Sequence, residues 1–363
     1  MGKATWSGWL MAVAVSVGGV IAAGCTYSPY KPSAPAFSGD SSAARETTVV
    51  ANLDTPAPKG KNVIWCGTFQ LCWDQLKPLV GPIRVAGAEE TVRRLDAGRM
   101  PADDLPPGGY YAAAGRVKDG IIETIRAQMA ERFPNVSPAL PEADGAEAVA
   151  YAYLHGAVKF RQPYFDYAGI PEFVNSAGQR AGVKCFSLSD NEYDDNLNGK
   201  LRRQIDILYC HVKDHYPEEF VLDLDKTSAP SQLILACVAP KETLAATWHD
   251  VQRKMDEWKP AQEERAFRDN DKLVVPEVNY KIKHSFKELE AGGGLKAWQD
   301  IDFRLDRSGA IVSSAAGMYA WGMSRNFSFT RPFLIALRKR GAAEPYFVMW
   351  IDNAELLCKE NAR

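Results

Sequence analysis

Apolar residues recur at helical spacing in the first half of the chain and mostly at strand spacing in the second half. Asn62–Leu71 is an apolar run with one glycine inside it, which predicts a buried strand leading into a helix over Phe69–Leu79. In Tyr110–Phe133 the apolar residues follow a helical period, and Pro134 ends the pattern. Ala148–Val158 is a long apolar run, which indicates a strand covered on both faces.

From residue 205 onwards, apolar or alternating runs between turn residues predict mainly strands. The exceptions are an amphipathic helix over Leu244–Trp258, closed by Pro260, and a short helix over Phe286–Ala291. Helices early and strands late, without an internal repeat, predict an α+β fold with antiparallel sheets. The expected strands are 205–212, 219–224, 233–239, 273–282, 301–305, 327–337 and 345–351, and a hairpin turn over 338–344 joins the last two.

One segment, Gly309–Asn326, fits neither pattern. It is rich in glycine, serine and alanine, almost uncharged, and lies between two strand-like runs. A long connection of this kind inside a compact domain usually has a function. It also carries Met318, Trp321 and Met323, and loops without a role rarely display such large apolar side chains.

The N-terminus predicts export. Lys3 supplies a positive charge, Leu10–Ile21 is apolar, and the small residues 22–24 precede Cys25. This arrangement resembles the lipobox of bacterial lipoproteins, in which the cysteine is acylated. The alternative is an ordinary signal peptide followed by an unrelated cysteine.

Residues 26–60 are rich in proline, serine, alanine and threonine, which favours a flexible tether. We therefore expect a lipoprotein-type signal peptide over 1–24, a disordered tether over 25–60 and a folded domain over 61–358. The expected location is the cell envelope, on the periplasmic or surface face of a membrane. Export permits disulfides among the six other cysteines, and buried free thiols are the alternative.

The composition narrows the function classes. Hydrophobic residues make up 46% of the 363, which excludes disorder throughout. The net charge of −2, from 43 basic and 45 acidic residues, gives no basic excess for binding nucleic acid. The chain contains no GxSxG, HExxH, GxGxxG or P-loop motif, so we expect neither an enzyme nor a cofactor. His211 and His215 lie in a charged, turn-like context, and we expect no metal site there.

Three motifs follow one another near the C-terminus. Leu305–Ala316 (LDRSGAIVSSAA) places a glycine before a run of small residues, Phe327–Leu337 (FSFTRPFLIAL) contains Pro-Phe before an apolar run, and Pro345–Leu356 (PYFVMWIDNAEL) is a closing strand. In this order they resemble the reactive-loop hinge, the signature and the last strand of the serpins, a family of protease inhibitors. Four earlier segments agree with that family in order, namely 62–71, 152–166, 232–248 and 274–291.

The resemblance implies a serpin-like fold, with mixed β-sheets surrounded by helices and an exposed reactive-type loop. Serpins offer this loop as bait to a protease, and the cut loop inserts into the central sheet. The partner would be a serine or cysteine protease, and the chain would be a monomer. The scissile bond would join Met323 and Ser324, with Trp321 and Arg325 as alternatives. The hinge would comprise Gly309, Ala310, Ser313, Ser314, Ala315 and Ala316.

Several positions depart from the family pattern. Ile311 and Val312 are large and apolar where a serpin hinge has acidic or small residues. Arg307 stands where glutamate is usual, and Gln299 stands where a histidine supports opening of the sheet. These departures favour the alternative function of a non-inhibitory serpin-fold lipoprotein that acts as a binding or structural module.

Overall fold

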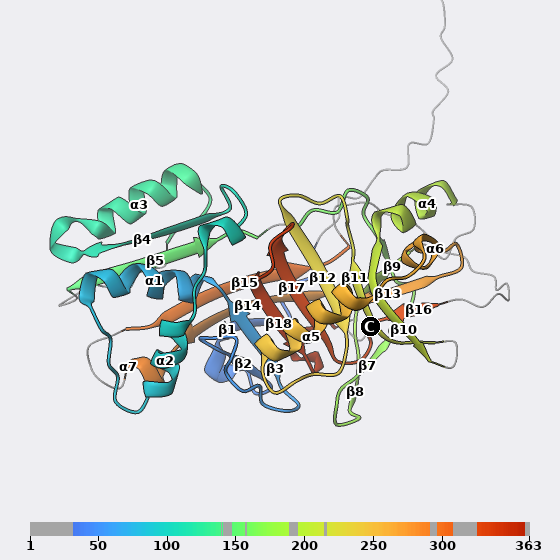
Figure 1. Cartoon of the computed structure of the whole chain (residues 1–363), viewed down its shortest axis with the longest axis horizontal. Helices are drawn as coiled ribbons and strands as arrows, with labels where there is room; N and C mark the ends of the chain where they lie inside the picture. Colours follow the sequence, from blue (N-terminus) through green and yellow to red (C-terminus); the bar gives the residue numbers. More distant parts are fainter. Residues whose placement is uncertain are drawn as a thin grey trace, which may run out of the picture.

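The computed structural model describes residues 32–138, 140, 147–156, 158–188, 195–213, 216–290, 296–307 and 325–359. The described part is elongated (Figure 1). At one end lie the helices α1 (Thr68–Val80), α2 (Glu89–Ala97) and α3 (Ile121–Arg132). The larger sheets form the rest of the molecule.

A seven-stranded sheet runs through the core. Its strand order is β10 (Asp206–Lys213), β11 (Tyr216–Asp223), β12 (Ser231–Cys237), β17 (Phe333–Lys339), β18 (Pro345–Ile351), β3 (Asn62–Cys66) and β2 (Thr47–Val49). β2 pairs with β3 in parallel, and the other neighbours are antiparallel. Every residue of β3, β12 and β18 is buried, as their unbroken apolar runs predict. The helix α5 (Leu244–Glu257) lies across this sheet in Figure 1.

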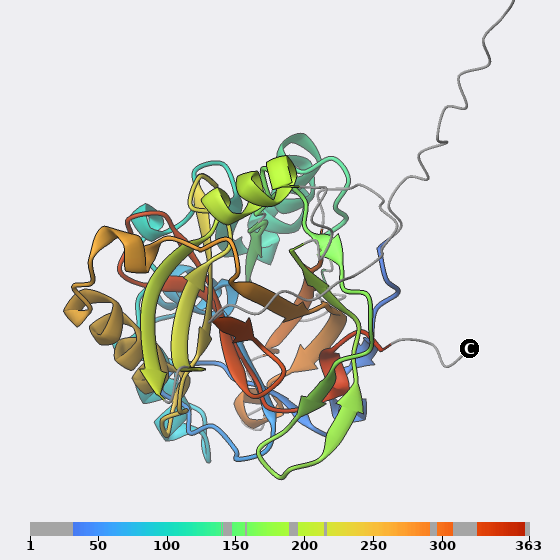
Figure 2. The same ribbon diagram turned by 90° about the vertical axis from the view of Figure 1, so that its right-hand side faces the viewer.

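Two further sheets mix parallel and antiparallel pairs. The three-stranded sheet has the order β1 (Phe37–Asp40), β14 (Val278–Ser285) and β15 (Trp298–Leu305). The four-stranded sheet has the order β16 (Asn326–Ser328), β13 (Lys272–Pro276), β9 (Cys185–Ser187) and β6 (Phe165–Asp166). Seen from the end in Figure 2, β10 and β11 (yellow-green) lie on one side of the last strands (red) and the green strands on the other.

Two pairs of strands complete the fold, together with three short helices. The pairs are β4 (Tyr110–Arg116) with β5 (Ala148–Leu154), and β7 (Glu172–Val174) with β8 (Arg180–Gly182). The remaining helices are α4 (Asp195–Gln204), α6 (Gln262–Arg265) and α7 (Lys287–Glu290). The prediction of an α+β fold with mixed sheets surrounded by helices is confirmed.

The β4–β5 pair lies between two helices. One face packs against α3 and forms a small core of its own, and the other face, with α1, joins the main core. The buried members of the small core are Tyr111, Ile121, Ile125 and Met129.

Two predicted elements are corrected. The helix expected over Tyr110–Phe133 is a strand in its first part, and α3 begins only at Ile121. Gly120 precedes it with a φ of 77°, a left-handed conformation that interrupts any longer helix. The strand expected over 273–282 is two strands, because after Pro276 the chain leaves the four-stranded sheet for the three-stranded one.

The expectation of a disordered tether over 25–60 is wrong for the part described. Residues 37–40 form β1, which pairs with β14, and residues 47–49 form β2, which pairs with β3. The Glu355 carboxylate accepts hydrogen bonds from Arg45 N (2.8 Å), Glu46 N (3.1 Å) and Thr47 Oγ1 (2.6 Å). A strand edge pairs through backbone N–H and C=O groups. A segment with polar side chains has these groups just as an apolar segment does, so it can pair with an existing sheet. We call residues 33–49 the N-terminal strap.

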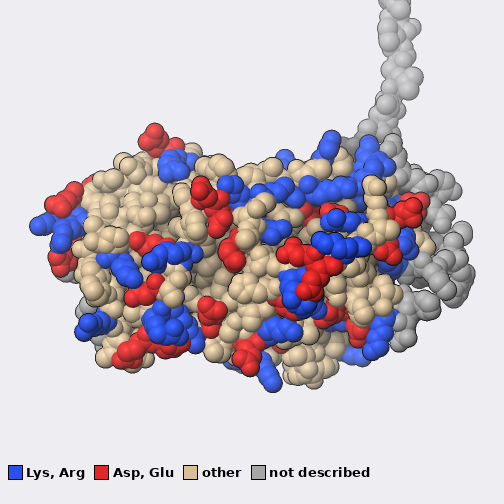
Figure 3. Space-filling view, viewed as in Figure 1, with Lys and Arg blue, Asp and Glu red and all other residues tan. Residues whose placement is uncertain are grey.

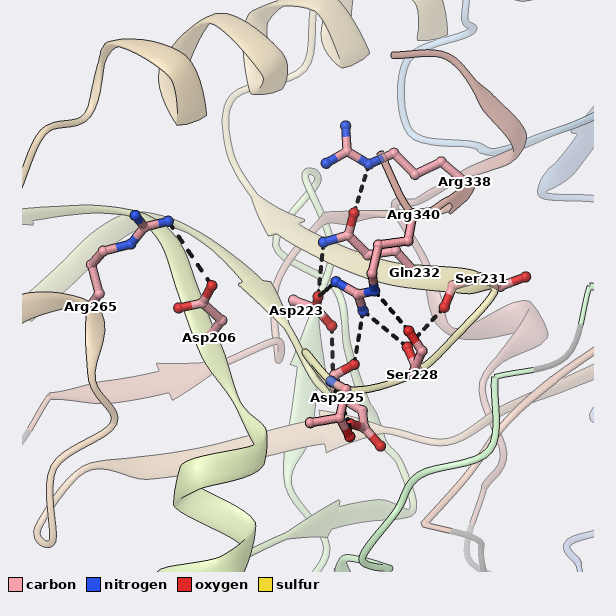
Figure 4. Close-up of polar contacts among 10 residues, drawn as sticks. Asp206, Asp223, Asp225, Ser228, Ser231, Gln232, Arg265, Arg338 and Arg340 are labelled. Carbon is pink, nitrogen blue, oxygen red and sulfur yellow. Dashed lines mark hydrogen bonds and ion pairs between the residues drawn. The ribbon is translucent and has the colours of Figure 1, made fainter. Parts of the chain in front are cut away.

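A partly buried polar network ties two turns together (Figure 4). Arg338 Nε donates to Gln232 Oε1 (2.7 Å), and Gln232 Nε2 donates to Asp223 Oδ2 (2.8 Å). Arg340 Nη1 donates to the same carboxylate oxygen (3.0 Å). The β11–β12 turn is thereby joined to the β17–β18 hairpin. The six cysteines that the structure describes are all free thiols.

Candidate functional site

A groove of about 1650 Å³ separates β5 from β14 and β15. Its lining is apolar toward the core and charged toward solvent. The apolar lining includes Phe69, Leu76, Ile301, Phe303, Leu337 and Phe347, and the charged lining includes Lys281, Lys283, Asp300 and Asp302. Strand β5 borders the groove on one side, and strands β14 and β15 border it on the other.

Both strands that border the groove have an unpaired edge. β15 pairs along its whole length with β14, and no described strand pairs with its other edge. β5 pairs with β4 and with no other described strand. Free backbone N–H and C=O groups on a strand edge are a template for an additional strand.

The two bordering strands lead to the same end of the groove. Downstream of β5, Tyr164 N donates to Arg307 O (3.1 Å), two residues beyond β15. The Arg307 guanidinium forms an ion pair with Asp166 and is 3% exposed. The chain on the N-terminal side of residues 308–324 is therefore fixed at this point.

Gln299 connects β15 to the start of α1. Its Nε2 donates to Cys66 O (3.0 Å) and to Thr68 Oγ1 (2.6 Å). Its Oε1 is buried and has no hydrogen-bond partner among the described residues. The resemblance to serpins implies a histidine at position 299. In this chain, Gln299 occupies that position and links β15 to the start of α1.

The C-terminal side of the same segment is fixed by Arg325. Its guanidinium forms an ion pair with Asp271, whose side chain is 1% exposed. Arg325 was a candidate residue before the scissile bond, and a protease must take such a residue into its specificity pocket. In this structure Arg325 is buried at 8% exposure, so the structure argues against that alternative.

The other predicted site residues lie outside the described residues. They are Met323, Ser324, Trp321, Cys25 and the hinge residues Gly309, Ala310, Ser313, Ser314, Ala315 and Ala316. Sequence reasoning missed Asp166 and Asp271, the partners of the two arginines that bracket the segment. The sequence does contain a signal for these ion pairs, because one arginine stands on each side of the segment of small residues.

The groove's electrostatics favour binding over covalent chemistry. Burial raises the pKa of the Cys72 thiol and of the Tyr151 hydroxyl to about 12 each, so both are neutral at pH 7. Neither side chain is an activated nucleophile. Burial also raises the pKa of Asp300, while Lys281 Nζ pairs with Asp302 Oδ2 at 2.7 Å. On the face shown in Figure 3, acidic and basic side chains are interspersed.

The described residues contain no group of three or more metal-ligating side chains arranged around a common centre. They also contain no helix with the length and apolar character needed to cross a membrane.

No family model and no curated protein matches the sequence. Among solved structures, the chain is similar to native protease nexin-1 with heparin, at 10% identity and a TM-score of 0.45, over 81% of this chain and 92% of that one. It is similar to thyroxine-binding globulin in complex with thyroxine, at 11% and 0.47, over 81% and 93%. It is also similar to Serpin48, a highly specific serpin of the insect Tenebrio molitor, at 12% and 0.41, over 80% and 92%.

Identities of 10–12% concern the fold alone, and TM-scores of 0.41–0.47 carry no argument about activity. The motifs of this chain and the geometry of its groove are therefore what indicate a function.

Proposed function

We propose that this chain is a serpin-like protease inhibitor that presents residues 308–324 as bait to a serine or cysteine protease. One observation carries the proposal. The groove has two unpaired strand edges, and the segment that leaves β15 at its end has the composition of a strand that could fill it.

Strand addition supplies the driving force. A strand placed between β5 and β15 would satisfy both free edges and cover the apolar lining. The eight residues of β15 present an edge of roughly 26 Å at about 3.3 Å per residue. Ser313, Ser314, Ala315 and Ala316 suit such a site, because small residues enter a packed sheet without displacing its neighbours.

The finer assignments belong to the same proposal. Cleavage would occur between Met323 and Ser324, with Trp321 as the remaining alternative, and an apolar residue before the cut suits a chymotrypsin- or elastase-like protease. The hinge would comprise Gly309, Ala310, Ser313, Ser314, Ala315 and Ala316. The protein would act as a monomer without a cofactor or catalytic activity of its own. It would be exported and held at a membrane through lipid on Cys25.

Thermal unfolding before and after one cut tests the proposal. The chain from residue 32 onwards keeps the N-terminal strap, and a protease site placed at 321–324 allows a single cleavage. We expect the melting temperature to rise by more than about 10 °C after the cut, because insertion completes the sheet. The control carries the same protease site in the β7–β8 turn at 175–178, where a cut should not raise it. An unchanged melting temperature after the first cut would contradict the proposal.

A second function has specific support. Arg307, itself buried, is fixed at the start of the segment by its ion pair with the half-exposed Asp166, and Ile311 and Val312 are large for a hinge. Both features oppose insertion and favour a non-inhibitory scaffold that binds a partner through its surface. Absence of a shift after cleavage, together with slow cleavage of the segment as an ordinary substrate, would support this second function.

A further inference from the structure

Three basic side chains lie exposed where four parts of the chain meet. Arg161 lies between β5 and β6, Arg203 is in the last turn of α4, and Lys226 is in the β11–β12 turn. The end of β17 is the fourth part. No ion pair joins any of the three side chains to another residue that the structure describes. We call Arg161, Arg203 and Lys226 the basic junction.

Hydrogen bonds to the main chain hold the basic junction together. Lys226 N donates to Gln204 O (2.9 Å), and Gln162 N donates to Gln204 Oε1 (2.6 Å). Arg161 N donates to Oδ2 of the buried Asp225 (2.6 Å). The fold therefore fixes the main chain beneath all three charges, so they form one surface and do not belong to independent loops.

The exposed charge of this surface is positive. The two carboxylates beneath the turn, Asp223 and Asp225, are each 1% exposed, and Arg340 Nη1 pairs with Asp223 at 3.0 Å. In Figure 3, acidic and basic side chains are mixed over most of the face, but basic ones form a row over the β11–β12 turn. Exposed cations spread over a wide surface suit an extended anionic partner.

The described chain begins close to the basic junction. Lys184 Nζ donates to Ser33 Oγ (3.0 Å), and the ring centroid of Phe186 lies 6.2 Å from that of the phenylalanine that precedes Arg161. Cys25 lies eight residues before Ser33, and eight residues span at most about 29 Å. A membrane that holds lipid on Cys25 is therefore within reach of the basic junction. The helix α3, by contrast, lies at the other end of the molecule from β9 (Figure 1).

We propose that the basic junction binds the anionic headgroups of a phospholipid membrane. This inference rests on the proposed function in one respect, the lipid on Cys25, which favours a membrane over a soluble polyanion as the partner. The lipid limits the distance between the protein and the membrane. The basic junction fixes which side of the protein faces the headgroups, because each lysine or arginine near an anionic surface adds to the attraction.

Vesicle binding by a chain without lipid tests the proposal. The protein is the chain from residue 25 onwards with Cys25→Ser, which keeps every described residue. It is sedimented with vesicles of phosphatidylcholine alone, or with about 30% phosphatidylglycerol added, in low and in physiological salt. We expect binding only to the vesicles that contain phosphatidylglycerol. Binding should be weaker in physiological salt, because salt screens exposed charges.

The test variant combines Arg161→Gln, Arg203→Gln and Lys226→Gln. Each lysine or arginine near an anionic surface contributes about fivefold in affinity, so we expect roughly hundredfold weaker binding. All three side chains are exposed, and an unchanged melting temperature checks that the variant folds.

The matched control removes the same charge elsewhere, through Lys59→Gln, Lys118→Gln and Arg126→Gln. These three side chains are also exposed, and Lys118 and Arg126 lie beside and within α3. The control should bind like wild type. An equal loss in control and test variant would show that binding follows net charge, and it would overturn the assignment to the basic junction.

A conservative variant checks the kind of attraction. Arg161→Lys with Arg203→Lys keeps both charges and should bind like wild type, because headgroups respond to charge and do not require the forked guanidinium. A loss as large as that of the test variant would overturn the proposal.

The remaining outcomes concern the partner. Binding of wild type to neither vesicle, or to both equally, would overturn the proposal. Binding to heparin without binding to either vesicle would assign the basic junction to a soluble polyanion and would overturn it as well. No step of this test requires a cut in the chain, so failure here leaves the proposed inhibitor function to its own test by melting temperature after cleavage.

Discussion

At the scale of single residues, His284 couples the N-terminal strap to the fold. Its Nδ1 lies 2.6 Å from Ser41 Oγ, and its ring meets Phe286 edge-on with centroids 4.4 Å apart. Burial lowers the pKa of His284, while Asp40 and Glu288 act in the opposite direction. The neutral imidazole is thus the form that the folded state prefers.

This preference predicts a pH dependence of stability. Because the folded pKa lies below the unfolded value near 6.5, the unfolded state binds more protons in between. The contribution of His284 to stability is present above about pH 6.5 and is lost as pH falls toward the folded pKa. We expect urea unfolding of wild type to lose more stability between pH 7.5 and 5.5 than that of His284→Gln. Equal slopes for the two proteins would contradict this.

Gln299 gives a second prediction at this scale. Gln299→Ala removes two hydrogen bonds and leaves Cys66 O without this donor, which should lower the free energy of unfolding by about 1–3 kcal/mol. Gln299→His keeps a ring donor and should recover part of the loss. The control is Gln179→Ala, in the exposed β7–β8 turn, which should change stability little. Equal urea midpoints for Gln299→Ala and wild type would show that the link does not stabilise the uncut state.

The same scale shows why the candidate site was only partly predictable. Composition alone singles out the segment around 309–326, because small residues in a long connection are a local signal. Whether Arg325 is exposed depends on Asp271, 54 residues earlier in the chain. The groove depends on which strand edges remain unpaired. Contacts between residues far apart in the chain, and the pairing of strand edges, produce no local sequence pattern that could predict them.

At the scale of elements, the predictions were accurate where a sequence pattern is compatible with only one type of secondary structure. β18 has the predicted bounds 345–351, and β12 differs from the predicted 233–239 by two residues at each end, because unbroken apolar runs specify buried strands. β1 and β2 were missed because they are edge strands, held by backbone pairing to β14 and β3. Polar composition indicates a lack of apolar burial, but it does not exclude pairing with an existing sheet edge.

At the scale of the whole molecule, the groove lies beside a β4–β5 pair that contributes one face to a small second core and the other face to the main core. Residues of β4, β5 and α3 enclose the small core around Ile125, while β14 and β15 belong to the main core. A change in the width of the groove therefore moves the β4–α3–β5 unit against the rest, with α1 between them. The packing between α3 and the β4–β5 pair should also loosen on its own, because its buried residues form a cluster distinct from the main one.

Two matched substitutions test this independence. Ile125 and Ile234 are both fully buried, the first in the small core and the second in the central sheet. Each change to alanine should cost about 2–5 kcal/mol. In Ile125→Ala we expect faster amide exchange confined to 110–154, with the main melting transition nearly unchanged. In Ile234→Ala we expect the whole transition to move down. If Ile125→Ala lowered the main transition equally, the two cores would form one cooperative unit, and filling the groove would require the entire fold to rearrange.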